Sequence, residues 1–381
     1  MSIIVNMGIF FMNIIFALMK LLPVQKKITY ISRQMDITPM DFTLTIKQMQ
    51  KDHPEYQHVV LAKMIHPGMK AKIGYVGHMF VQMYHIATSE AVILDTYCIC
   101  ISVLHQRKSL VVIQMWHALG AFKKFAYSIL DCQEGSSSKV AKLMHMHENY
   151  TYVLSSSPYA AKFFAEAFNV REDQMRIYPL PKTDLLVDKE RRAAIIKRID
   201  EVYPELNDGK KVIVYAPTFR KTHDHLQEGI EALIKEVDFE KYHFVLKLHP
   251  LSSITINDTR VINDHRFSSL EFFHKADIII TDYSAVLFEA SLLNIPIYFY
   301  DFDYDFYKIG RSFYIDYQHD MPGYMSGDPK DLMQAIDDNH YDYKKLQDFS
   351  QLMISPCTIS YTKDFTDFLY HTLNKEALLS N

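Results

Sequence analysis

The sequence lacks both glycine-rich signatures of nucleotide binding. It contains neither a G-x-G-x-x-G run nor a P-loop of the form G-x-x-x-x-G-K-[S/T], and its 381 residues include only 11 glycines. Such loops bring backbone N–H groups against a phosphate, so their absence argues against assigning the chain to the dinucleotide-dependent dehydrogenases or the P-loop kinases. Internal repeats of fixed period and low-complexity segments are missing as well, which predicts an ordered globular chain.

Cysteine is also scarce, and neither sign of charge dominates. Four cysteines in 381 residues cannot form a disulfide framework, and this predicts a reducing compartment. The balance of 41 basic against 45 acidic residues provides no overall positive field, so we expect no nucleic-acid partner.

Two motifs that resemble metal sites are incomplete. Cys98 and Cys100 have no second Cys/His pair at zinc spacing, so we interpret them as buried thiols. The acidic run at 301–305 lacks the glycine and the glutamate of a calcium loop, because Phe306 and Ser312 stand at those positions. We therefore expect an ordinary solvated turn there, with no metal and no cofactor.

The N-terminal segment from Ile3 to Leu22 is almost wholly apolar. Its polar residues Asn6, Asn13 and Lys20 recur every seven residues, which on a helix makes one narrow polar stripe opposite a wide apolar face. This pattern and the nearby basic residues favour a helix on an anionic membrane surface over a signal peptide. A spanning helix, which the length allows, and a helix packed on the protein's own sheet are the alternatives.

Strands and helices alternate in both halves of the chain, which predicts two domains with parallel sheets. We expect a membrane-associating helix at 1–22, a Rossmann-like domain at 23–180 and a second one at 181–355. Pro-rich residues 179–184 form the hinge, and a C-terminal helix at 356–381 crosses back onto the first domain. The clearest elements are strands at 28–32, 59–62, 91–94, 152–154, 211–216 and 243–248, and helices at 41–51, 159–169 and 190–199.

Polar side chains follow four apolar strands, at the point where each strand ends. The strand at 277–280 precedes Thr281, Asp282 and Ser284, and the other three end in Thr218 with Arg220, in His249, and in His117 with Lys123 and Lys124. Carboxyl ends of parallel strands share one edge of a sheet, where ligands bind. We therefore predict that these groups converge on one site, with a phosphate at the start of the helix after Ser284. A plain helix N-cap at Asp282 or Ser284 is the alternative.

Three of these side chains suit acid–base or phosphate chemistry. His117 could be a general base near neutral pH, although a structural histidine is the commoner outcome among 18. His249, held before a proline, could donate to an anionic phosphate. The fork-shaped guanidinium of Arg220 matches phosphate oxygens.

The same residues, taken in order, resemble the CDP-glycerol glycerophosphotransferase family of teichoic acid synthesis. The resemblance rests on 114–118 with 120–125, on 215–220, on His249-Pro250, and on 281–284 with Phe288-Glu289. Residues 296–301 and 321–323 resemble further landmarks of that family. It implies an α/β, GT-B-like fold of two Rossmann-type domains with parallel sheets facing a central cleft, the first binding the acceptor and the second the CDP donor.

The resemblance also implies a reaction and a set of roles. A polyol phosphate passes from a CDP-polyol to a hydroxyl of an undecaprenyl-type lipid-linked glycan acceptor, and CMP is released. His117 would be the base and His249 a second catalytic group. The donor phosphates and hydroxyls would be held by Thr218, Arg220, Thr281, Asp282, Ser284 and Glu289, with Asp95, Lys123, Lys124, Lys182 and Asp184 as weaker candidates.

The chain departs from the family pattern in places, for example in Ala118-Leu119-Gly120 after His117 and in Ala285 where a serine is common. Glycerol phosphate is the favoured cargo and CDP-ribitol the nearest alternative donor. A nucleotide-sugar glycosyltransferase of the same fold and an inactive membrane-docked partner also remain open. The expected location is peripheral, on the cytoplasmic face of the cell membrane.

Overall fold

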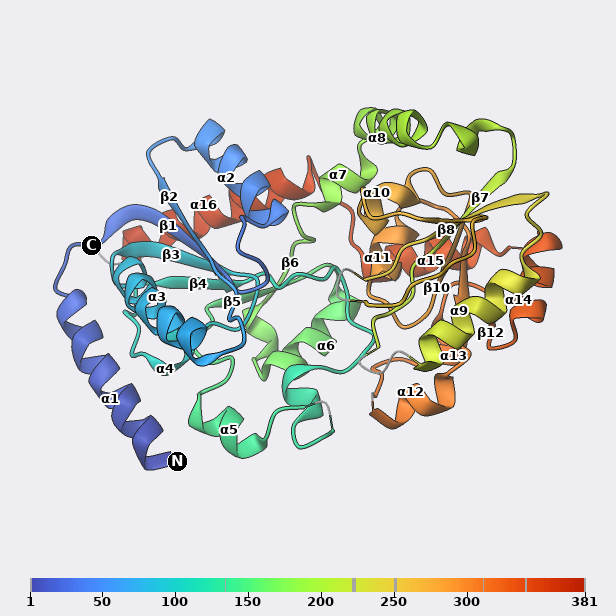
Figure 1. Ribbon diagram of the computed structural model, residues 1–381. Helices are drawn as coiled ribbons and strands as arrows, with labels where there is room; N and C mark the ends of the chain where they lie inside the picture. Colours follow the sequence, from blue (N-terminus) through green and yellow to red (C-terminus); the bar gives the residue numbers. More distant parts are fainter. Residues whose placement is uncertain are drawn as a thin grey trace. The chain divides into compact units, whose positions relative to one another are not determined.

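A computed structural model describes residues 2–133, 135–220, 224–249, 252–310, 312–339 and 341–379. The chain divides into two compact units (Figure 1). Unit 1 comprises 1–119, 124–184 and 355–381, and unit 2 comprises 120–123 and 185–354. Each unit is built around one six-stranded sheet whose paired strands are parallel.

The sheet of unit 1 has the strand order β2-β1-β3-β4-β5-β6. Its strands are β1 (Gln25–Ser32), β2 (Gln57–Ala62), β3 (Ser89–Leu94), β4 (Val111–Gln114), β5 (Tyr152–Ser155) and β6 (Met175–Ile177). Its α-helices are α1 (Ser2–Met19), α2 (Met40–Asp52), α3 (Met69–Ala87), α4 (Ile99–Val103), α5 (Ser138–Leu143), α6 (Pro158–Phe168) and α16 (Tyr361–Leu379), and α7 (Thr183–Val187) continues into unit 2.

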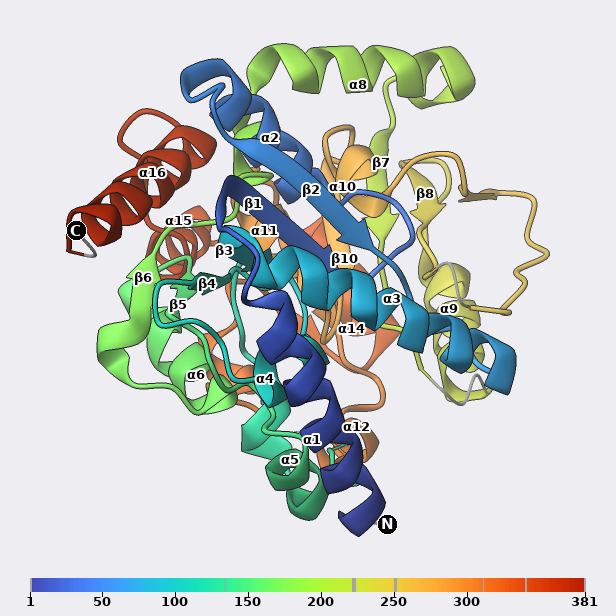
Figure 2. The same cartoon turned by 90° about the vertical axis from the view of Figure 1, so that its left-hand side faces the viewer.

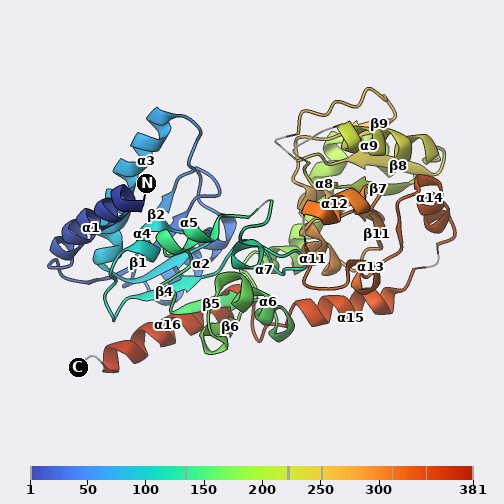
Figure 3. The same cartoon turned by 90° about the horizontal axis from the view of Figure 1, so that it is seen from below.

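The last helix belongs to unit 1 although it follows unit 2 in the sequence. Figure 3 shows α16 beneath the strands of unit 1. It packs beside α2, and its Phe368 ring stacks on Tyr178 with centroids 4.8 Å apart.

The sheet of unit 2 has the order β12-β11-β10-β7-β8-β9. Its strands are β7 (Lys211–Tyr215), β8 (Tyr242–Leu246), β9 (Val261–Asn263), β10 (Ile278–Thr281), β11 (Ile297–Tyr300) and β12 (Met325–Ser326). Its helices are α8 (Lys189–Val202), α9 (Asp224–Glu236), α10 (Ser269–Phe273), α11 (Val286–Ser291), α12 (Tyr304–Gly310), α13 (Tyr317–Asp320), α14 (Pro329–Asp337) and α15 (Tyr343–Met353).

The strands arise from runs of β-branched and apolar residues. Every residue of β4, β10 and β11 is buried, as expected for parallel strands covered on both faces. The predicted strands and helices are confirmed within a few residues, but the convergence of four strand ends on one edge is wrong in part. β4, which precedes His117, pairs with β3 and β5 in unit 1, whereas β7, β8 and β10 lie in unit 2.

Helix α1 uses its polar stripe to dock on unit 1. Asn13 Nδ2 donates to the Val103 carbonyl at 3.0 Å, the His105 N–H donates to Asn13 Oδ1 at 2.8 Å, and Phe16 is buried. The opposite face is exposed: Ile4, Phe10 and Leu18 retain 76%, 62% and 63% of their accessible surface. α1 lies beside α3 (Figure 2). Among the described helices, none is both long and apolar enough to cross a membrane.

Candidate functional site

The strand order of unit 2 defines where a ligand can enter its sheet. Read from the other edge, the strand order is β9-β8-β7-β10-β11-β12, which is the order of a doubly wound sheet. The direction in which successive strands are added reverses between β7 and β10. Connections after these two strands leave toward opposite faces, and a crevice opens between them at their carboxyl ends. The segments that carry Thr218, Arg220 and Asp282 follow these two strands.

Asp282 ties the two strand ends together. Its carboxylate is fully buried, and Oδ1 accepts hydrogen bonds from the Thr218 N–H at 2.8 Å and the Thr218 hydroxyl at 2.6 Å. Its Oδ2 accepts from Arg220 Nη2 at 2.9 Å. Asp282 is therefore not a helix N-cap, because its acceptor atoms are occupied by the loop after β7.

Arg220 is held between two carboxylates. Its Nε and Nη2 donate to Asp303 at 2.9 and 3.1 Å, and Nη1 donates to the Thr218 carbonyl at 2.6 Å. Its guanidinium carbon lies 5.2 Å from each of the ring centroids of Tyr283 and Tyr307. Burial alone would lower the pKa of Arg220, but the carboxylates of Asp282 and Asp303 outweigh it and raise the pKa. Because every guanidinium nitrogen donates within this network, Arg220 acts first as a positioning group.

Asp303 was missed by the sequence analysis, and the expectation of a solvated turn at 301–305 is wrong. Asp301 is buried, and Asp303 closes the ion pair with Arg220, which lies 83 residues earlier. The alternation of Asp with Phe and Tyr gives no signal for such a distant partner. Only the fold reveals it.

The other predicted residues of unit 2 differ in how far they can reach a ligand. Thr281 is buried and donates to the Ala216 carbonyl at 2.9 Å, and Glu289 is buried on α11. Ser284 is half-buried and its Oγ accepts from the Val286 N–H at 3.4 Å. His249 is exposed, and its ring lies 5.2 Å from that of Phe219; Pro250 lies outside the described residues. Thr218, Ser284 and His249 thus keep accessible surface at this edge.

The helix expected to offer its N-terminus to a phosphate is short. α11 has six residues, begins after Ala285 and has no side-chain cap. Any phosphate at this edge would therefore depend on side chains more than on a helix dipole.

Unit 1 has its own reversal of strand order, between β1 and β3. The Ser32 hydroxyl at the end of β1 donates to Asp95 Oδ2 at 2.8 Å, directly after β3. Burial raises the pKa of Asp95 to about 6. Its other oxygen, Oδ1, is buried and receives no hydrogen bond within the described part of the chain.

His117 is exposed and is anchored to the same point. Its Nδ1 lies 3.0 Å from the Asp95 carbonyl oxygen. A carbonyl can only accept, so Nδ1 carries the proton and the lone pair of the neutral ring is on Nε2. Trp116, one residue earlier, has a φ of 59°, which is unfavourable for a bulky residue. The main-chain N–H of Trp116 donates to Gln114 Oε1 at 3.0 Å, and the indole ring stacks on Phe125.

The weaker candidates fall in different places. Lys182 Nζ donates to the His117 carbonyl at 3.1 Å, so it lies beside the histidine. Asp184 instead accepts from the Tyr361 and Thr362 N–H groups, at the start of α16. Lys123 belongs to unit 2, where Nζ donates to the Tyr307 hydroxyl at 3.3 Å, and half-buried Lys124 belongs to unit 1. The structure therefore groups Asp95, His117 and Lys182 in unit 1, and Thr218, Arg220 and Asp282 in unit 2.

Comparison with known proteins gives a consistent result. Residues 14–356 match the family described as CDP-Glycerol:Poly(glycerophosphate) glycerophosphotransferase. A teichoic acid ribitol-phosphate primase of Bacillus spizizenii is 35% identical over 369 residues, which is 94% of both chains. A teichoic acid glycerol-phosphate primase of Bacillus subtilis is 31% identical over 72% of this chain and 71% of its own.

Solved structures share the fold. The wall teichoic acid polymerase TagF matches with a TM-score of 0.72 at 21% identity, over 99% of this chain and 98% of the other. The MnaA–UDP structure from S. aureus matches with a TM-score of 0.60 at 12% identity, over 92% and 97% of the two chains. These likenesses concern the fold alone.

The Asp282–Arg220 pair makes a testable contribution to stability. Asp282→Asn leaves the buried guanidinium short of one counter-charge, and we expect a loss of about 3–5 kcal/mol in the free energy of unfolding in urea. The matched control is Asp348→Asn, which breaks an exposed 2.8 Å pair with Lys344 and should cost less than about 1 kcal/mol. Equal unfolding midpoints for the two variants would contradict the central place given to Asp282.

Proposed function

Because the chain belongs to the CDP-glycerol:poly(glycerophosphate) glycerophosphotransferase family, and is a transferase of teichoic acid biosynthesis, we propose that it moves ribitol phosphate from CDP-ribitol to a hydroxyl of a lipid-linked acceptor and releases CMP. One observation carries the proposal: this chain combines two features. Unit 1 contains a histidine oriented as a base, and unit 2 contains a strand-reversal site with accessible hydroxyls.

The choice of ribitol follows from the relatives. The ribitol-phosphate primase matches along 94% of each chain, whereas the glycerol-phosphate primase matches along 72% and 71% at lower identity. The sequence alone favoured glycerol. A primase-like addition of few units, rather than long polymerisation, is part of the same proposal.

Unit 2 is the proposed donor domain of a GT-B-like protein. Ser284 and His249 would donate hydrogen bonds to the diphosphate of the CDP-polyol at the edge between β7 and β10. Thr218, whose N–H and hydroxyl both donate to Asp282, would position the loop beside them. The Asp282–Arg220–Asp303 network would hold the loop after β7 in place, so that these donors need little reorganisation as charge grows on the departing CMP.

Unit 1 is the proposed acceptor domain, with His117 as general base. Nε2 would take the proton of the acceptor hydroxyl while its oxygen attacks the polyol-bearing phosphorus. The phosphorus–oxygen bond to CMP breaks, and CMP leaves with the bonding pair. The hydrogen bond from Nδ1 to the Asp95 carbonyl fixes the tautomer that this step requires.

The reaction class can be tested with purified protein, a soluble analogue of the lipid-linked acceptor, and CDP-ribitol or CDP-glycerol in parallel. We expect acceptor-dependent release of CMP, followed by chromatography, and faster release from CDP-ribitol. Faster release from CDP-glycerol would reverse the assignment of the polyol. Absence of CMP release with both donors would refute the proposed reaction.

Replacement of His117 by alanine tests the base. We expect turnover to fall by about 10²–10⁴-fold, the usual contribution of general-base catalysis, while the dissociation constant of CDP-ribitol measured by calorimetry stays within about twofold. His66→Ala is the control, because His66 is another exposed histidine of unit 1 and is paired with Asp36. Wild-type turnover in His117→Ala would exclude this role.

The exposed apolar face of unit 1 supports peripheral binding to an anionic membrane on the cytoplasmic side. Both α1 and α3 contribute to it, since Met69 and Ile73 of α3 keep 73% and 65% of their surface exposed. Lys26, Lys70 and Lys72 are exposed on the same unit and could meet lipid phosphates. α1 would lie along the surface, because Asn13 and Phe16 hold its other side on the protein.

The double substitution Phe10→Ser and Leu18→Ser tests this surface while it keeps the docking contacts of Asn13. Each side chain contributes about 1.5–3 kcal/mol when fully buried, so binding to vesicles containing phosphatidylglycerol should fall at least about tenfold in sedimentation. Leu352→Ser, on α15 of unit 2 with 46% exposure, is the control and should bind normally. Unchanged vesicle binding of the double variant would contradict a membrane-binding role for α1 and leave it a purely structural one.

A further inference from the structure

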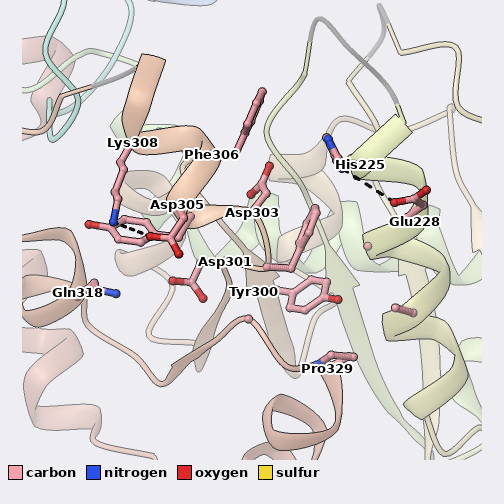
Figure 4. A pocket seen from close by; sticks show the side chains of 15 residues that line it. His225, Glu228, Tyr300, Asp301, Asp303, Asp305, Phe306, Lys308, Gln318 and Pro329 are labelled. Atoms are coloured by element: carbon pink, nitrogen blue, oxygen red, sulfur yellow. Dashed lines mark hydrogen bonds and ion pairs between the residues drawn. The ribbon is translucent and has the colours of Figure 1, made fainter.

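Unit 2 contains a second feature that the strand-end residues do not explain. A cavity of about 970 Å³ opens at the carboxyl end of β11, between α9 and the segment that leads into α12. Figure 4 shows Asp301 and Asp303 in the space between the helix of Lys308 and the helix of Glu228. The wall also includes aromatic side chains, namely Tyr300, Phe302, Tyr304 and Phe306.

Tight packing at the wall gives the cavity a defined shape. A Cβ on Gly229 of α9 would lie 2.6 Å from the Phe302 ring, and one on Gly327 would lie 3.2 Å from the Phe302 Cα. Both distances are too short for an unperturbed side chain, so glycine allows Phe302 to pack against both segments. The cavity is therefore built by specific packing and does not result from loose loops.

The three aspartates of the cavity have different surroundings. Asp303 is bound by Arg220, and Asp305 forms a 2.5 Å ion pair with Lys308 at the exposed rim. Asp301 is only 8% exposed, and no side chain among the described residues donates a hydrogen bond to its carboxylate. The Tyr304 N–H and the Tyr283 hydroxyl reach its main-chain oxygen instead. The Asp301 carboxylate accepts a hydrogen bond from its own main-chain N–H. Because two carboxylate oxygens can accept about four hydrogen bonds, acceptor capacity remains for the hydroxyl groups of a ligand in the cavity.

The charge of the wall restricts the chemistry of that ligand. Three of the four lining carboxylates have a basic partner: Asp303 pairs with Arg220, Asp305 with Lys308, and Glu228 lies 4.0 Å from His225. Asp301 is the fourth. The basic groups at the wall are thus engaged by carboxylates and offer a phosphate little counter-charge. Hydroxyl groups can instead donate to the Asp301 carboxylate, and the carbon chain between them can lie against aromatic rings.

We propose that this cavity binds a polyhydroxylated chain, with hydroxyl groups donating to the Asp301 carboxylate. The inference rests on the proposed function and deepens it, since the chain would be the polyol of the CDP-polyol or, with the same chemistry, the glycan of the acceptor. Asp303 connects the two features: one side of it lines the cavity and the other holds Arg220, whose network ends at Thr218. Phosphate would stay at the strand ends and hydroxyls would enter the acidic cavity.

Calorimetric titration of the full chain tests the cavity without relying on turnover. Wild-type protein should bind CDP-ribitol more tightly than CMP, and Asp301→Asn should weaken CDP-ribitol binding by roughly tenfold or more, as expected for a hydrogen bond to a charged group. CMP binding should change less than about twofold, because its phosphate and base lie outside the cavity. Asp331→Asn, an exposed aspartate on α14 that does not line the cavity, should leave both affinities unchanged.

A parallel titration with the soluble acceptor glycan separates the two sources of hydroxyl groups. A loss of glycan affinity in Asp301→Asn, with CDP-ribitol unaffected, assigns the cavity to the acceptor and still supports a polyhydroxyl site. The proposal is overturned if Asp301→Asn and Asp301→Ala bind both ligands as the wild type does, if CMP affinity falls equally, or if wild-type protein binds neither ligand. Asp301-dependent binding of CDP-ribitol without any CMP release would instead refute the proposed reaction and keep the cavity assignment.

Discussion

The buried ion pairs that Arg220 forms with Asp282 and Asp303 determine the arrangement of unit 2 around its strand reversal. Three segments that are far apart in the sequence, after β7, β10 and β11, meet at one guanidinium. A buried cation is tolerated only with its counter-charges and hydrogen bonds in place, so the positions of Thr218, Tyr283 and the wall of the acidic cavity depend on this contact. The site at the edge and the cavity beside it are two consequences of one constraint.

Unit 1 solves the same topological problem with a different electrostatic arrangement. Its reversal between β1 and β3 also holds a buried carboxyl group, Asp95, but a hydroxyl from Ser32 takes the place of a cation. The pKa of Asp95 is therefore raised by burial, whereas Asp282 is matched by a positive charge. The main chain of Asp95 orients His117. A hydroxyl-bearing acceptor suits this weakly charged environment, and a diphosphate donor suits the polar edge of unit 2.

Sequence reasoning found the strands because fully buried parallel strands are continuous apolar runs, and it found the strand-end residues because chemistry concentrates at those ends. It included the strand before His117 in the predicted domain at 23–180, but it grouped the polar end of that strand with three strand ends of the second sheet, since the meeting of strand ends depends on the order of strands in space. The partnership of Arg220 with Asp303 is a contact between distant residues that leaves no periodic signal. The seven-residue spacing of Asn13 was visible in the sequence, but its partners Val103 and His105 were not. The cavity at Asp301 was hidden for the same reason, because an acidic run with aromatic residues is also typical of a solvated turn.

The most direct test of the central claim is a crystal structure with a non-hydrolysable phosphonate analogue of CDP-ribitol. We predict the diphosphate within hydrogen-bond distance of Ser284 or His249, at the edge between β7 and β10, with the Asp282–Arg220–Asp303 network unchanged beneath it. A nucleotide bound in unit 1 at Ser32 and Asp95, or a phosphate that displaces Asp303 from Arg220, would contradict this prediction.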